Sequence, residues 1–296
     1  MANGFISDDR GDPVRHLVTG PMGRSLILQE NSHRGTCGVP LRLPAELAHL
    51  KLSPLDLRAV KYASRFRQYP DLIRINGRVY AGLTSPYGFG GNATTIASTA
   101  PDDPQGWTSP DRFHRIVLDQ CEISRRANGF VFMYNGDGAG ATIPQTLHFS
   151  AIERHSAMWP LEAAAASAEM ARGEQVTVIE AEDLFPLAAV RIQGDVVDVA
   201  GRAAKAAVRW HAIAGSDATE NVIVSARDGV VALYYVPRSR KREFARFKGV
   251  EIRVGSLETL GEVVTETSPA DPALRRFEGL CGLLRAARPD GVALRC

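Results

Sequence analysis

The sequence predicts an α+β fold in which the sheet is antiparallel. Two hairpin signals support this: Asn76 and Gly77 separate two short apolar runs, and residues 227–229 (Arg-Asp-Gly) separate two longer ones. The Asn-Gly pair supplies the positive φ angles that a type I′ turn requires. Stretches with apolar residues at helical spacing alternate with such strand pairs and not with single strands, which argues against a parallel α/β sheet.

In the first third of the chain, residues 25–28 (Ser-Leu-Ile-Leu) form the one apolar run before residue 45 and predict an edge strand. Residues 43–52 and 54–63 carry apolar positions at helical spacing, and Pro54 suits the first turn of a helix. Residues 72–80 then predict a strand, a tight turn and a returning strand.

In the middle of the chain, residues 113–127 predict a helix, and residues 129–134 a buried strand that leads into a glycine-rich loop. Residues 145–152 predict the partner strand, so that a histidine at position 148 projects from a sheet. Residues 160–173 are rich in alanine and predict a helix that ends at its last residue, a glycine.

In the last third, residues 203–214 predict another helix, and residues 222–236 the second hairpin. The final helix is predicted to begin at Asp271, a suitable N-cap followed by proline, and to run to Arg288. No internal repeat or low-complexity linker divides the chain. We therefore expect one compact unit, with residues 1–64 as an N-terminal elaboration packed on a core of residues 65–296.

The composition indicates an ordinary soluble globular protein. Of the 296 residues 45% are hydrophobic and 23% charged, and the net charge is only +2. Four cysteines lie far apart, without Cys-x-x-Cys spacing, which predicts reduced thiols and no zinc site.

The sequence also gives expectations about location and partners. Since no signal peptide or membrane-length apolar run is recognisable, we expect a cytoplasmic protein without a membrane partner. No basic stripe is interleaved with aromatic residues, which argues against nucleic acid. The oligomeric state stays open, with a homodimer as one possibility.

The most informative segment combines a glycine-rich loop with one histidine. Gly136, Gly138 and Gly140 lie within five positions, and His148 follows eight residues after the last of them. Such a loop can direct consecutive backbone N–H groups at an anion, which makes it a candidate phosphate cradle. A neutral imidazole can carry a phosphoryl or nucleotidyl group as a covalent intermediate. The alternative interpretations are an ordinary hairpin loop and a structural histidine.

This segment resembles the active-site motif of the nucleotidyl-transferring branch of the histidine-triad (HIT-like) superfamily, which includes galactose-1-phosphate uridylyltransferase, diadenosine tetraphosphate phosphorylase and the GDP-hexose phosphorylases. In that motif a Gly/Ala/Ser-rich loop and a Pro or Gln precede His-x-His-x-Gln, and the second histidine is the nucleophile. The alignment places the nucleophile at His148. Thr146 stands in place of the first histidine, and Ser150 in place of the glutamine.

Three further segments resemble the same branch in the same order. They are residues 83–98, which include Asn92, residues 220–239, which end in Pro-Arg-Ser, and residues 254–261. The resemblance covers roughly residues 65–265. It implies an antiparallel half-barrel sheet with helices packed on one side.

The resemblance also implies an activity, nucleotidyl transfer by double displacement. A nucleoside diphosphate sugar or a dinucleoside polyphosphate would donate its nucleotidyl group to the histidine, and phosphate or a sugar phosphate would accept it. The alternatives are a hydrolase, in which water is the acceptor, and a catalytically silent nucleotide-binding module. No metal ion or other cofactor is implied, and neither the base nor the distal group can be identified.

The resemblance assigns catalytic positions to His148, Ser150 and Thr146. A serine hydroxyl donates one hydrogen bond but reaches less far than a glutamine, which leaves room for water or another residue at the phosphoryl group. The amides of residues 138–142 are candidate donors to phosphate oxygens. The implied nucleotide-binding residues are Asn135, Gly138, Ala139, Gly140, Ala141, Thr142, Gln145, Arg238 and Glu258.

For the other cationic and histidine residues the sequence predicts no role in catalysis. The cationic run that continues after Arg238, namely Arg240, Lys241 and Arg242, is predicted to face solvent. Elsewhere, structural or solvated roles are predicted for His33, His114, His155 and His211.

Overall fold

The structure is a computed structural model that describes residues 14–30, 71–84, 93–100, 103–127, 129–141, 144–169, 175–227, 229–265 and 272–292. The two helices predicted between residues 43 and 63 lie outside these ranges. Asp271, the predicted cap of the last helix, also lies outside them, as do His33 and Asn92.

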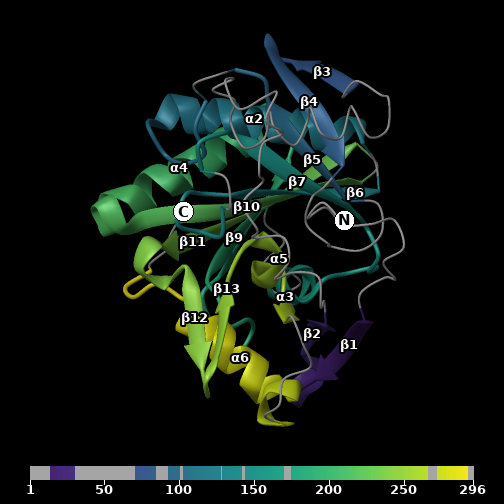
Figure 1. The fold of residues 1–296 in the computed structure, drawn as a ribbon, viewed down its shortest axis with the longest axis vertical. Helices are drawn as coiled ribbons and strands as arrows, with labels where there is room; N and C mark the ends of the chain where they lie inside the picture. Colours follow the sequence, from purple (N-terminus) through teal and green to yellow (C-terminus); the bar gives the residue numbers. More distant parts are fainter. Residues whose placement is uncertain are drawn as a thin grey trace, which may run out of the picture.

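The described residues form one nine-stranded sheet in the order β3-β4-β5-β7-β6-β10-β11-β9-β8. Every neighbouring pair in it is antiparallel. The sheet runs across the centre of the molecule (Figure 1). Its strands are β3 Asp71–Ile75, β4 Arg78–Thr84, β5 Ala93–Ser98, β6 Phe130–Asn135, β7 His148–Glu153, β8 Val176–Ile179, β9 Ala189–Gly194, β10 Ala218–Arg227 and β11 Val230–Ser239.

Both predicted hairpins are present. The β3–β4 turn places Asn76 at φ 48° and Gly77 at φ 81°, the pair of positive angles that a type I′ turn needs. The β10–β11 hairpin is longer than predicted, because its ladder continues from the Arg227–Val230 pair to Ala218 opposite Ser239.

Two long helices, α2 Pro110–Arg126 and α4 Val196–Ala214, cover one face of the sheet (Figure 1). Each has a side-chain cap at its start. The Ser109 hydroxyl accepts from the Arg112 amide at 3.2 Å, and the Asp195 carboxylate accepts from two amides of the first turn of α4 at 3.0 Å. Their apolar faces share a buried core with alternate residues of β6, β7, β10 and β11.

The opposite face of the sheet is covered by shorter elements. This differs from the prediction, which placed helices on one side of the sheet only. They are the helices α3 Pro160–Glu169, α5 Ser256–Thr259 and α6 Phe277–Ala286, a hairpin of β12 Phe244–Phe247 and β13 Val250–Arg253, and a small sheet of β1 Val14–Thr19, β2 Ser25–Glu30 and β14 Glu262–Thr265. Because apolar side chains from all of these except β1 form a second core, the large sheet is buried on both faces.

Two predictions about individual elements were wrong. Strand β2 is not an edge strand, because it lies between β1 and β14 and pairs in parallel with the latter. The last α-helix begins only at Phe277, after a 3₁₀ turn over Pro272–Arg275. Leu274 of this turn and Phe277 of the helix both reach the core.

The parallel β2–β14 pair ties the N-terminal strands to the C-terminal third of the chain. The boundary predicted at residue 64 falls outside the described ranges, so the division into an elaboration and a core stays a prediction. Among the helices that the structure describes, none has both the length and the apolar character required to cross a membrane.

Candidate active site

His148 is the first residue of β7 and is 4% exposed. Its side chain lies on the face of the sheet that carries α5, because Ile152 belongs to the core on that face and Phe149 and Ala151 to the other. The ring atom Nδ1 lies 2.8 Å from the carbonyl oxygen of Thr146. Since a carbonyl can only accept, Nδ1 is the donor, and a neutral ring then has its lone pair on Nε2.

The side chain of Gln105 fixes the backbone of His148. The ladder between β6 and β7 stops at the Met133–Ser150 pair, and the next residues in register are Asn135 and His148. The Gln105 amide occupies this position: its Oε1 accepts from the His148 amide at 2.8 Å, and its Nε2 donates to the carbonyls of His148 at 3.1 Å and Asn135 at 2.7 Å. Gln105 therefore bridges the two strands where they separate around the glycine-rich loop.

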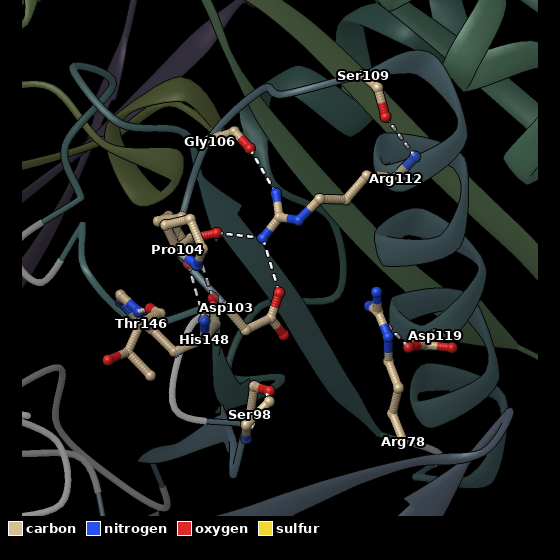
Figure 2. Close-up of polar contacts among 12 residues, drawn as sticks. Arg78, Ser98, Asp103, Pro104, Gly106, Ser109, Arg112, Asp119, Thr146 and His148 are labelled. Carbon is tan, nitrogen blue, oxygen red and sulfur yellow. Dashed lines mark hydrogen bonds and ion pairs between the residues drawn. The ribbon is translucent and has the colours of Figure 1, made fainter.

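Residues 103–106 form a strap that is itself held by Arg112 of helix α2. The Arg112 guanidinium donates to the Gly106 carbonyl at 2.7 Å, to the Asp103 carboxylate at 2.8 Å and to the Pro104 carbonyl (Figure 2). The strap also accepts from the Leu147 amide through the Asp103 carbonyl at 2.5 Å. Because backbone and side-chain bonds act together, the segment before His148 has little freedom to move relative to α2.

The glycine-rich loop, residues 136–141, packs closely against other backbone. A Cβ atom on Gly136 would lie 2.5 Å from Thr219 Oγ1, and one on Gly140 would lie 2.7 Å from the Cα of Gly255. Gly138 and Gly140 also have φ angles of 78° and 93°, in the region that glycine adopts most easily. Close contacts within the protein therefore account for the glycines of this loop.

The loop still offers backbone donors. The Ala139 amide donates to the Gly136 carbonyl at 2.9 Å, and the Gly136 amide donates to the Glu220 carbonyl at 2.8 Å. In the part of the chain that the structure describes, no acceptor lies at the amides of Gly138, Gly140 or Ala141. Gly140 and Ala141 are buried, whereas Gly138 is half-buried. Since buried amides are normally bonded, the amides of Gly140 and Ala141 in particular are suited to an anion. Thr142 lies outside the described residues.

A row of polar side chains crosses the sheet beside His148. Asn135 of β6 accepts at Oδ1 from Asn221 Nδ2 of β10 at 2.8 Å, and from the amide and the hydroxyl of Ser256 at 2.8 and 2.6 Å. Asn221 Nδ2 also donates to the Ala139 carbonyl at 2.8 Å. Asn135 is therefore a hub that joins two strands, the loop and the first turn of α5.

Arg238, predicted as a contact to phosphate, completes this row from β11 as a fully buried residue. Its Nη1 donates to Asn221 Oδ1 and to the Val254 carbonyl at 2.8 Å each, and its Nη2 donates to the Arg242 carbonyl at 3.0 Å. Burial lowers the pKa of Arg238 to about 10, an effect that the carboxylate of Glu258 opposes. In this structure the two terminal nitrogens of Arg238 support the loop and α5, whereas its buried Nε has no hydrogen-bond partner among the described residues.

Glu258, another predicted ligand contact, is 1% exposed. It accepts from the Gly255 amide at 2.8 Å, which stabilises the start of α5. Among the other predicted residues, Ser150 is buried on the same face as His148, and Gln145 is exposed. Thr146 contributes its backbone carbonyl to the histidine ring.

The cationic run after Arg238 does more than face solvent, contrary to the prediction. Arg240 Nη1 pairs with Asp137 Oδ2 of the glycine-rich loop at 2.6 Å, and Arg242 pairs with Asp290. Lys241 alone is largely exposed, at 83% of its side chain. Arg240 thus adds a cation to the rim of the loop.

Two further histidines have structural partners, as predicted. His155 pairs with Glu262 at 2.9 Å, and His211 pairs with Glu220 at 2.8 Å while stacking on Trp107. Among the described residues, no group of three or more His, Cys, Asp or Glu side chains is placed to hold a metal ion.

Sequence reasoning missed several residues that shape the site. Asn221 was detectable, because it is an uncharged polar residue at a fully buried position of an apolar strand. Gln105 and Arg112 had no local signal, since the bonds that matter join them to segments about 6 to 43 positions away. Ser256 follows a glycine at the start of α5, a position for which a cap but no contact with Asn135 could be expected.

A scan against protein-family models finds no match for this chain, and neither does a comparison with curated proteins.

A comparison with solved structures does find matches. Yeast Ap4A phosphorylase Apa2 matches with a TM-score of 0.60 and 10% identity, over 95% of this chain and 89% of that one. Its complex with Ap4A matches with a TM-score of 0.60 and 12% identity, over 96% and 92% of the chains. Its complex with AMP matches with 0.62 and 10%, over 95% and 91%. The chain has the fold of this phosphorylase, which confirms the predicted fold class.

Proposed function

We propose that this protein transfers a nucleotidyl group through a covalent intermediate on His148, with a dinucleoside polyphosphate or a nucleoside diphosphate sugar as the donor. The observation that carries the proposal is the ring geometry: Nδ1 is bonded to a backbone carbonyl at 2.8 Å, which leaves Nε2 as the nucleophilic atom of a neutral ring. Further support comes from the fold of an Ap4A phosphorylase that has been solved with Ap4A and with AMP.

In the proposed first step, Nε2 of His148 attacks the α-phosphorus of the donor in line with the departing oxygen. The P–N bond forms, the P–O bond to the distal phosphate breaks, and the leaving group departs with that oxygen. In the second step, an oxygen of the acceptor attacks the same phosphorus and the P–N bond breaks. Phosphate or a sugar phosphate is the proposed acceptor, as the resemblance implies.

The loop and the strap have separate roles in this proposal. The amides of Gly138, Gly140 and Ala141 stabilise the charge on the non-bridging oxygens, which changes little between ground and transition state but must be held in place. Gln105 and Arg112 act as positioning residues. Arg238 holds the loop through the hydrogen bonds of its terminal nitrogens.

The test is an intact-mass experiment on the full chain. The protein is incubated with Ap4A, and separately with nucleoside diphosphate sugars, and quenched before analysis. We expect a nucleotidyl adduct in the wild type and in His114→Ala, and none in His148→Ala. His114 is a matched control because it lies on α2, a helix that covers the face of the sheet opposite to the His148 side chain.

The products then identify the acceptor. With phosphate as the acceptor, the nucleotidyl group carried by His148 leaves as a nucleoside diphosphate, whereas hydrolysis releases it as a monophosphate. A nucleotide that raises the melting temperature without forming an adduct would indicate a silent binding module. Undiminished turnover in His148→Ala would overturn the covalent mechanism.

A further inference from the structure

Thr95 of β5 carries a buried hydroxyl without a hydrogen-bond partner. The residue is 2% exposed, and among the residues that the structure describes no donor or acceptor bonds its Oγ1. Buried hydroxyls are normally bonded, and one left alone loses its interactions with water without replacement. An unpaired hydroxyl at this depth therefore needs an explanation.

The register of the sheet places this hydroxyl beside the candidate site. Thr95 lies directly opposite Ser150 in the β5–β7 ladder, and Ala97 lies opposite His148. Side chains of opposed residues point to the same face, with Cβ atoms about 4.5–5.5 Å apart, and diagonal neighbours are about 7–8 Å apart. Thr95 and Ser150 are thus adjacent, and both lie on the same face as the His148 ring.

A phosphoryl group on His148 would meet these two hydroxyls. The Nδ1 atom faces the Thr146 carbonyl, on the side of His148 away from Ser150, so Nε2 lies on the opposite edge of the ring. The span from His148 to its diagonal neighbour Thr95 is comparable to the length of an imidazole with a phosphoryl group attached. A threonine and a serine hydroxyl each donate one hydrogen bond, and bonds to a charged oxygen are stronger than bonds between neutral groups.

We propose that the hydroxyls of Thr95 and Ser150 together bind a non-bridging oxygen of the phosphoryl group that His148 carries, so that Thr95 obtains its partner only when the enzyme is loaded. This inference rests on the proposed function. It names Thr95 as a substrate-binding residue. In this inference neutral hydroxyl donors bind one non-bridging oxygen, and the loop amides bind the others.

The test compares Thr95→Val with the wild type, using Ap4A as the donor. Valine has nearly the shape of threonine but lacks the hydroxyl, so its melting temperature should be equal or higher. The rate of adduct formation should fall by about 10- to 100-fold, the value of one hydrogen bond to a charged group. Thr95→Ser, which keeps the donor, should recover most of the rate. Thr177→Val on β8, a buried threonine at the far edge of the sheet, is the matched control.

The outcomes separate the two proposals. An adduct that forms equally fast in wild type and Thr95→Val would overturn the role of Thr95 and leave His148 in place. A lower melting temperature in Thr95→Val than in the wild type would show that the hydroxyl is bonded in the free protein, which also overturns the inference. Failure of the wild type to form an adduct with Ap4A or with nucleoside diphosphate sugars would overturn the proposed function, and this inference with it.

Discussion

The contact between the glycine-rich loop and helix α5 can be tested by Gly140→Ala, with Gly77→Ala as its control. Both glycines have positive φ angles, 93° and 81°. They differ in their surroundings: a Cβ on Gly140 would lie 2.7 Å from Gly255 Cα, whereas nothing lies within 4 Å of a Cβ on Gly77. The control therefore measures backbone strain alone.

The two costs can be worked out separately. An alanine in a left-handed conformation costs about 1–2 kcal/mol, of which the reduced entropy of the unfolded chain offsets about 0.4–1 kcal/mol. Carbon atoms pack at about 3.5–4.0 Å, so the new methyl group has to displace the backbone near Gly255 by about 1 Å. Overpacking of this kind costs about 1–3 kcal/mol. We expect a loss of about 1 kcal/mol for Gly77→Ala and about 2–4 kcal/mol for Gly140→Ala.

Urea denaturation followed by circular dichroism measures both losses, and adduct formation on His148 provides a second readout. A displacement of about 1 Å near reacting groups can reduce a rate by about 100-fold, so Gly140→Ala should also slow the transfer, whereas Gly77→Ala should not. Equal losses of stability in the two variants would refute the close packing of the loop on α5.

Three other predictions follow from buried polar groups. Arg238→Met should lower the free energy of unfolding in urea by about 3–5 kcal/mol, because three hydrogen bonds of a fully buried guanidinium are lost and their acceptors are left without this donor. Burial works to raise the pKa of Glu262, but His155 and Arg15 outweigh it and hold this pKa below its ordinary value of 4.5. The carboxylate therefore stabilises the fold above about pH 4.5, and the difference in stability between wild type and Glu262→Gln should shrink as the pH falls below that value. Gln105→Leu should slow adduct formation at saturating donor more than Gln105→Glu, which keeps the acceptor for the His148 amide; equal rates would exclude a positioning role.

The sequence was sufficient for elements whose signal is local. The Asn76-Gly77 turn requires two positive φ angles, and the ten-residue ladder of β10 and β11 follows from two apolar runs around one turn. The position of β2 could not be predicted in the same way. Its partner β14 lies more than 230 residues away, and a short apolar run does not show whether one or both of its edges are paired.

In the candidate site, too, only the features with a local sequence signal could be predicted. Glycines at three alternate positions and a single histidine are visible in the sequence, and they led to the loop and to His148. The partners of Arg238 could not be predicted, because Asn221, Val254 and Arg242 are brought to its guanidinium only by the fold. A cationic residue at the end of a strand has the same sequence signal whether it bonds protein oxygens or faces solvent.

The departure from the His-x-His-x-Gln pattern at position 146 has a specific physical meaning. The group that fixes the tautomer of His148 is the backbone carbonyl of Thr146, at 2.8 Å from Nδ1, and every residue type provides that carbonyl. Its place depends on the backbone from 144 to 148, which the strap holds through bonds between Gln105 and Pro144 and between Leu147 and Asp103. A histidine side chain at position 146 is therefore not needed to orient the His148 ring. Position 150 is different, because there the pattern uses a side chain, and serine is shorter than the glutamine of the pattern. The hydroxyl of Thr95, which has no partner among the described residues, lies beside Ser150.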